Sequence, residues 1–204
     1  MIFYDYYGAT DDEVRAFVRE MELGRLVTVS ADGHPHIGLY PFVFFDDYIE
    51  IHLNARDEQV ADLAAHPQCV FEVDEVLADI PSYWVHPENA SMATAYHQTV
   101  IFDCTSTMTA DGDVLAAQQS RVMDRYQPEG GFRPITIDDP MYRGMLGMLV
   151  AIRLDIVRCT AKFKIGQNRP PEIRARIIDK LKGRGRVRDG RAAAALQRTL
   201  DAGT

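Results

Sequence analysis

The spacing of apolar residues predicts an amphipathic helix near the start of the chain. Residues 10–24 carry apolar side chains every three or four positions, at Val14, Phe17, Val18 and Met21. This period places them on one face of a helix. Thr10 and Glu13 suit a capping box at its start, and Gly24 suits its end.

Strands are predicted where the apolar period changes to two. Between residues 25 and 54, three runs rich in Val, Ile, Phe and Tyr are separated by Asp32-Gly33 and Asp46-Asp47, which is typical of a β-meander with tight turns. Further strands are predicted at 68–76, 96–108 and 148–165. Further helices are predicted at 58–66 and 113–126, and in the tail after Pro171 and at 191–200.

This order of elements indicates a mainly β fold with flanking helices, in the α+β class. Five or six antiparallel strands joined by tight turns favour a closed or half-closed β-barrel. A doubly wound nucleotide-binding fold is not expected, because the chain has no G-x-G-x-x-G after a strand and no P-loop. We assign the barrel to residues 1–160 and a helical extension, packed on the same domain, to residues 161–204.

Composition indicates the class of protein and the cellular compartment to expect. The 47% hydrophobic and 25% charged residues are typical of a soluble globular chain. No apolar run approaches the ~20 residues of a membrane-spanning helix, so no membrane contact is expected. Cys69, Cys104 and Cys159 form no C-x-x-C pair. They are expected to be free thiols, and the protein to be cytoplasmic.

Charge is unevenly distributed along the chain, whose formal net charge is −8. Residues 162–204 hold 12 Lys and Arg against 4 Asp and Glu, so the rest of the chain is strongly acidic. A basic tail on an acidic body suits contact with phosphate, on nucleic acid or on a small ligand. It equally suits packing on an acidic neighbour, and charge alone does not decide between the two.

Three places carry candidate chemistry. Asn54, Arg56 and Gln59 surround a predicted helix start, where backbone N–H groups and a guanidinium can hold a phosphate, although a strand-end Arg is often only an ion-pair former. Trp84 lies in a loop rich in aromatic residues and prolines, and suits either a plug at one end of the barrel or the wall of a flat-ligand pocket. The third place is the pair His34 and His36, two positions apart beside a turn. These residues are better explained as exposed turn histidines than as metal ligands.

Several motifs together resemble the PaiB-like family of FMN-binding split-barrel proteins, the FMN-binding negative transcriptional regulators. The stretch LGRLVTVSADGHPHIGLYPFVF resembles that family's first hairpin. HLNARDEQVADLAAHPQCVFEV resembles its strand, turn, helix and strand, with Arg56 in the matching place. KFKIGQN resembles its K-x-K-x-S-Q-N signature, with Gly166 in place of Ser. The family's Trp-Asn-Tyr is replaced by Ala95, Tyr96 and His97.

The resemblance implies a split-barrel flavin-binding domain that forms a homodimer with FMN at the subunit interface. It implies that Arg56 and Gln59 lie near the FMN phosphate. It also implies that four residues of the tail segment lie near the flavin: Lys162, Lys164, Gln167 and Asn168. A regulatory protein whose tail contacts DNA is the function implied. Two alternatives to this regulatory function stay open: an FMN-dependent oxidoreductase, and a barrel that has lost its flavin and binds another small molecule or protein.

The tail segment is predicted to divide into two parts. Lys162 and Lys164 are two apart at a strand end, so their side chains share one face and can converge on one ligand. In the helix that follows, an apolar stripe is expected to be buried against the barrel or a partner subunit: Ile173, Ile177, Ile178 and Leu181. The cations off that stripe are expected to be solvated: Arg174, Lys180 and Lys182.

Overall fold

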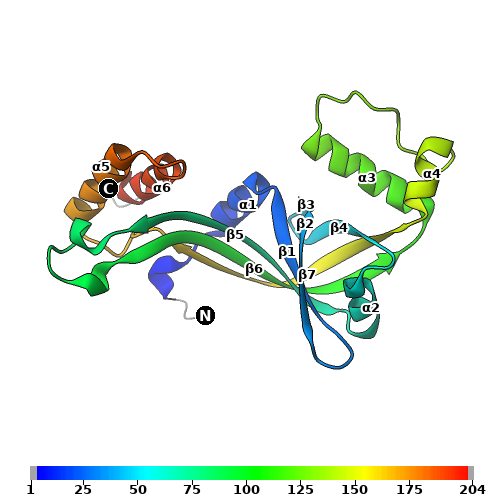
Figure 1. The fold of residues 1–204 in the computed structure, drawn as a ribbon, viewed down its shortest axis with the longest axis horizontal. Coiled ribbons are helices and arrows are strands. Elements are labelled where there is room, and N and C mark those ends of the chain that lie inside the picture. The colour runs from blue at the N-terminus through cyan, green and yellow to red at the C-terminus, as the bar shows by residue number, and fades with distance from the viewer. Residues whose placement is uncertain (1–3, 202–204) are drawn as a thin grey trace. The chain divides into compact units, whose positions relative to one another are not determined.

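The structure, a computed structural model, describes residues 4–201 and divides the chain into two units (Figure 1). The sheet unit comprises Arg15–Val73 and Ile101–Thr160. The helical unit comprises Met1–Val14, Asp74–Val100 and Ala161–Thr204. The predicted boundary between barrel and extension, at residue 160, stays a prediction, and both predicted parts include terminal residues outside the described range.

Seven strands form one sheet, in the order β2-β1-β5-β6-β7-β4-β3. Their bounds are β1 (Leu23–Val29), β2 (Pro35–Pro41), β3 (Val43–Phe45), β4 (Tyr48–Asn54), β5 (Gln68–Ile80), β6 (Thr94–Thr109) and β7 (Leu149–Lys164). The β1–β2, β1–β5, β3–β4 and β4–β7 pairs are antiparallel. Together with six α-helices in the described chain, this confirms the α+β class.

The predicted meander is wrong at Phe42, where the second apolar run divides into β2 and β3. β2 pairs with β1 at one end of the strand order, whereas β3 pairs with β4 at the other end. One residue therefore joins the two end strands, so the sheet must curve strongly within the sheet unit. The order is nevertheless open, with no β2–β3 pairing in the described residues. Of the two predicted forms, the closed β-barrel is therefore excluded.

Phe42 is fixed at this crossing by packing and by hydrogen bonds. Its side chain is fully buried and meets the Phe71 ring edge to face, with centroids 5.3 Å apart. Its backbone N–H donates to the Tyr126 hydroxyl at 3.0 Å, and that hydroxyl donates to the Phe42 carbonyl at 3.0 Å. Buried backbone N–H and C=O groups need hydrogen-bond partners. At Phe42, which lies between two strands, the Tyr126 hydroxyl is the partner of both groups.

The first helix, α1 (Asp11–Glu20), confirms its predicted start but not its predicted end. Glu13 Oε2 accepts from the Thr10 N–H at 2.7 Å, and Thr10 Oγ1 accepts from the Glu13 N–H at 3.3 Å. Gly24 does not end the helix; it lies in β1. A Cβ built there would lie 2.3 Å from the Phe71 ring, so glycine permits close strand packing.

Three further helices belong to the sheet unit: α2 (Glu58–Ala65), α3 (Gly112–Tyr126) and α4 (Pro140–Leu146). The first two were predicted. α4 was not, although its start carries a clear signal: Asp139 caps it by accepting from the Met141 N–H at 2.9 Å, and Pro140 occupies its first turn.

The helical unit is built on α5 (Pro171–Arg184) and α6 (Asp189–Asp201), which Figure 1 shows side by side. Short 3-10 helices η1 (Asp5–Tyr7), η2 (Ser82–Trp84) and η3 (Ala90–Met92) complete it. The predicted stripe of α5 is confirmed as a buried face, in a cluster that includes Leu196 of α6. No helix of the described chain has both the length and the apolar character needed to cross a membrane.

Arg174 departs from its predicted solvated position. Its guanidinium donates to the Thr199 carbonyl at 2.7 Å and to Thr199 Oγ1 at 3.0 Å, which ties α5 to α6. Lys180 and Lys182 are exposed as predicted.

Candidate functional site

The turn between β4 and α2, in the sheet unit, holds the first group of predicted site residues. Asp57 caps α2 by accepting from the Gln59 N–H at 3.0 Å. Asn54 Oδ1 accepts from the Arg56 N–H at 2.9 Å, which shapes the turn. Arg56 is exposed, and its guanidinium makes no hydrogen bond or ion pair within residues 4–201. Arg56 is therefore the group in this turn that is available to an anion.

Gln59 has a positioning role in this turn. It is only 2% exposed, and its amide nitrogen donates to the Leu26 carbonyl at 3.1 Å and to Thr28 Oγ1 at 3.0 Å. Its amide oxygen accepts from the Tyr40 hydroxyl at 2.7 Å. These bonds fasten α2 to β1 and β2, and so hold the turn that carries Arg56.

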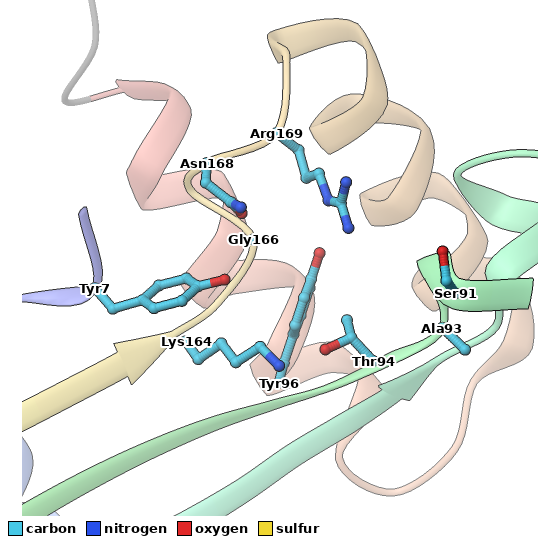
Figure 2. A pocket seen from close by; sticks show the side chains of 9 residues that line it. All are labelled: Tyr7, Ser91, Ala93, Thr94, Tyr96, Lys164, Gly166, Asn168 and Arg169. Atoms are coloured by element: carbon cyan, nitrogen blue, oxygen red, sulfur yellow. The ribbon is translucent and has the colours of Figure 1, made fainter. Parts of the chain in front are cut away.

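A second candidate site is a pocket of about 250 Å³ inside the helical unit (Figure 2). Its walls come from η1, from the η3–β6 segment and from the end of β7 with the loop before α5. The lining residues are Tyr7, Ser91, Ala93, Thr94, Tyr96, Lys164, Gly166, Asn168 and Arg169. Lys164 and Asn168 were predicted site residues; the others were not.

The charge in this pocket is positive. Lys164 and Arg169 line it, and no carboxylate does. Burial, and then the neighbouring cations Lys162 and Arg169, lower the pKa of Lys164. Both effects disfavour the charged form of the lysine, and no carboxylate among the lining residues offsets them.

Two of the sequence's departures from the family pattern meet in this pocket. Gly166 has φ +84°, and a Cβ built there would lie 2.1 Å from the Tyr96 hydroxyl oxygen. The serine of the family signature would collide with Tyr96 in this arrangement. Gly166 and Tyr96 therefore fit each other, because the missing side chain of one makes room for the hydroxyl of the other.

Three further predicted site residues of the helical unit do not line the pocket: Lys162, Gln167 and Trp84. Lys162 Nζ lies 5.8 Å from the centroid of the Tyr7 ring. Gln167 fixes the loop, with its side chain accepting from the Ile165 N–H at 3.0 Å and donating to the Phe163 carbonyl. Trp84 is only 5% exposed and packs in the core of the unit, with the Arg184 guanidinium 4.8 Å from its ring centroid. Trp84 does not line the pocket.

His36 lies in a polar network of the sheet unit. Its Nδ1 is 2.7 Å from Asp62 Oδ2, which also accepts from Thr28 Oγ1 at 2.6 Å. The hydrogen bond to Asp62 raises the pKa of His36. In the described range, no group of three or more His, Cys, Asp or Glu is arranged to hold a metal ion.

The exposed cation of the β4–α2 turn and the two cations of the pocket can each hold an anionic group. Residues 1–158 match the family described as "Putative FMN-binding domain". The chain belongs to this family, and FMN is its cofactor. No curated protein matches the sequence.

Solved structures share the fold. The conserved hypothetical protein Rv2991 of Mycobacterium tuberculosis is similar at TM-score 0.62 and 19% identity, over 83% of this chain and 94% of that one. The flavocytochrome Anf3 of Azotobacter vinelandii is similar at TM-score 0.66 and 14% identity, over 80% and 72%. The FAD and heme binding protein of Mycobacterium smegmatis is similar at TM-score 0.63 and 16% identity, over 76% and 71%.

The residues on these two surfaces fit FMN chemically. The phosphate of FMN is anionic, and Arg56, Lys164 and Arg169 are cations without a carboxylate partner in the described chain. Hydroxyl and amide donors line the same pocket as Lys164 and Arg169. A guanidinium at an open turn, and a polar pocket with two cations, are both suited to a phosphate.

Proposed function

We propose that the protein is a PaiB-like split-barrel flavoprotein in which Arg56 contacts the phosphate of FMN. The observation that supports this most directly is the Arg56 turn: an exposed guanidinium without an internal partner stands on a turn fixed by Asn54, Asp57 and Gln59. When bound, FMN supplies hydride and electron transfer. The chain's own contribution is to bind and orient it.

Replacing Arg56 with alanine is expected to weaken FMN binding by about 10- to 100-fold and to leave riboflavin binding nearly unchanged. A charge-assisted contact to phosphate contributes about 1.5–3 kcal/mol, and riboflavin has no phosphate. Titration of both flavins, followed by flavin fluorescence, measures this difference. Lys182→Ala is the matched control, since it removes one exposed positive charge elsewhere. An equal loss for both flavins would show that Arg56 acts on the fold.

We further propose that the protein works as a homodimer with FMN at the subunit interface. The support is an exposed apolar face on the β1–β2 hairpin. Ile37 and Leu39 are 68% and 53% exposed, and lie opposite Val27 and Arg25 in the register. β2 is also an end strand of the sheet. An apolar face beside an unpaired strand edge is typical of an interface.

Ile37→Lys is expected to convert a dimer into a monomer at micromolar concentration, because it places charge at the centre of this face. Multi-angle light scattering measures the mass directly. Val187→Lys, at a fully exposed valine outside the hairpin, is expected to remain dimeric. A wild-type protein that is monomeric under these conditions contradicts the proposal.

The regulatory role implied by the family resemblance is the second part of the proposed function. Contact between the tail and DNA requires cations that have no internal partner. Arg186 and Arg191 form ion pairs with Asp79 and Glu75 of β5, each at 2.8 Å, so these two arginines are neutralised within the unit. The exposed residues Lys180 and Lys182 on α5 are the cations that we assign to any nucleic-acid contact.

A further inference from the structure

We propose that the pocket of the helical unit is a binding site for the oxyanion, phosphate or carboxylate, of a small ligand. The site is formed by Lys164, Arg169, Asn168, Tyr96 and Thr94 (Figure 2). It goes beyond the proposed function, which places the FMN phosphate at Arg56, in the sheet unit.

The first argument is the absence of a counter-ion. The Lys164 side chain makes no ion pair or hydrogen bond within residues 4–201, and the one hydrogen bond of the Arg169 guanidinium there is a weak one to Met92 Sδ at 3.5 Å. Other arginines of the same unit behave differently: Arg184 forms a bidentate pair with Asp189 at 2.8 and 2.6 Å. Arg184 is thus neutralised within the unit, whereas Lys164 and Arg169 lie together in one pocket that no carboxylate lines.

The second argument is that the neutral groups of the pocket can donate hydrogen bonds. Burial raises the pKa of Tyr96 to about 12 and also raises that of Tyr7, so both hydroxyls stay protonated at neutral pH. Ser91 and Thr94 add hydroxyls, and Asn168 adds an amide. Cations combined with neutral donors suit an oxyanion, whose oxygens only accept hydrogen bonds.

The third argument is size and rigidity. A volume of about 250 Å³ is smaller than the ~300–1,000 Å³ of typical pockets for whole drug-sized ligands. This size suits one polar group better than a complete flavin. Gly166 at φ +84° and the Gln167 bond to the Ile165 N–H hold the loop in place, so the donors are arranged before a ligand arrives.

Inorganic phosphate is the probe that tests the site. Titrated into the wild-type protein at low ionic strength, it is expected to shift the backbone amide NMR signals of Gly166 and Asn168. Lys164→Met and Arg169→Met are each expected to weaken this binding by about tenfold or more, because each removes one charge-assisted contact. Arg198→Met removes an equal charge from an exposed position of α6 outside the pocket and is expected to bind phosphate like the wild type.

A wild-type protein whose pocket signals do not respond to phosphate would overturn the proposal. So would pocket variants that bind phosphate as the wild type does. Retained signal dispersion in the two variants shows that they are folded, which separates loss of a contact from loss of structure.

A repeat of the titration with the FMN-saturated protein identifies the source of the oxyanion. If FMN blocks phosphate, the pocket receives the phosphate of the flavin itself, and the assignment of that phosphate to Arg56 is wrong. If both bind together, the pocket receives a second small ligand that carries an anionic group. Both outcomes support the site. A protein that binds phosphate here but does not bind FMN contradicts the proposed function alone.

Discussion

Replacing Tyr96 with alanine is expected to lower the free energy of unfolding of the helical unit by about 3–5 kcal/mol. Tyr96 is 2% exposed and packs in a cluster that includes Trp84, Ile165, Ile177 and Leu196. Truncation of a large aromatic side chain removes buried area and leaves a cavity, and both effects are destabilising. Trp84 is the chain's only tryptophan and lies in this cluster. Its fluorescence during urea denaturation therefore measures the decrease in the free energy of unfolding.

Tyr96→Phe is the matched control for this change. It keeps the ring and removes only the hydroxyl that lines the pocket, so it is expected to cost less than about 1.5 kcal/mol. The same variant is expected to bind phosphate less well, because it removes one donor. A Tyr96→Ala protein as stable as the wild type would show that the cluster does not hold the unit together.

Asp189→Ala is the second change with a large expected effect, about 3 kcal/mol of lost stability. Both Asp189 oxygens bind the Arg184 guanidinium, and Oδ2 also accepts from the Arg186 N–H at 2.9 Å. The carboxylate is buried, and the Arg184 side chain is only 15% exposed. The variant leaves this guanidinium with the exposed Asp79 as its remaining carboxylate, at 3.2 Å. Denaturation followed by Trp84 fluorescence measures the effect.

The pH dependence gives an independent readout of the same pair. The hydrogen bonds from Arg184 hold the pKa of Asp189 below its ordinary value. The stabilisation is therefore present above the unfolded-state pKa, about 3.9, and is lost as the pH falls through the folded-state pKa. Asp189→Ala is expected to lose less stability than the wild type on acidification below about pH 4. Asp179→Ala, on the exposed face of α5, is expected to keep the wild-type profile; an Asp189→Ala profile identical to the wild type would contradict this assignment.

This network also gives the basic tail a structural interpretation. The sequence left two explanations open, contact with phosphate or packing on an acidic neighbour. Asp79, Glu75 and Asp189 all lie in the helical unit and pair with three tail arginines, so packing accounts for part of the tail's charge. Lys164 and Arg169 have no carboxylate partner in the described chain, and they are the cations that line the pocket.

Local sequence signals predicted most of the elements correctly. The capping box of α1, the apolar stripe of α5 and the helix before Pro67 depend on residues a few positions apart, and such signals are readable in one sequence. The division of the second apolar run at Phe42 was not readable. It depends on where β2 and β3 find partners, and on Tyr126, which is 84 positions away.

The candidate site was predictable only in part for the same reason. Lys164 and Asn168 belong to a recognisable segment, whereas Tyr7, Ser91 and Tyr96 come from distant parts of the chain. The close approach of Gly166 and Tyr96 explains why this sequence departs from the PaiB-like motifs at both positions, although the two departures look independent in the sequence. Gln59 shows the opposite case: a polar residue beside a predicted phosphate site that is buried and bonded within the protein.

The visible absorption spectrum of the purified protein, before and after addition of FMN, tests the central claim most directly. We expect the bands of a bound flavin, either on purification or after FMN is added and the excess is removed. A colourless protein that retains no added FMN would contradict the account.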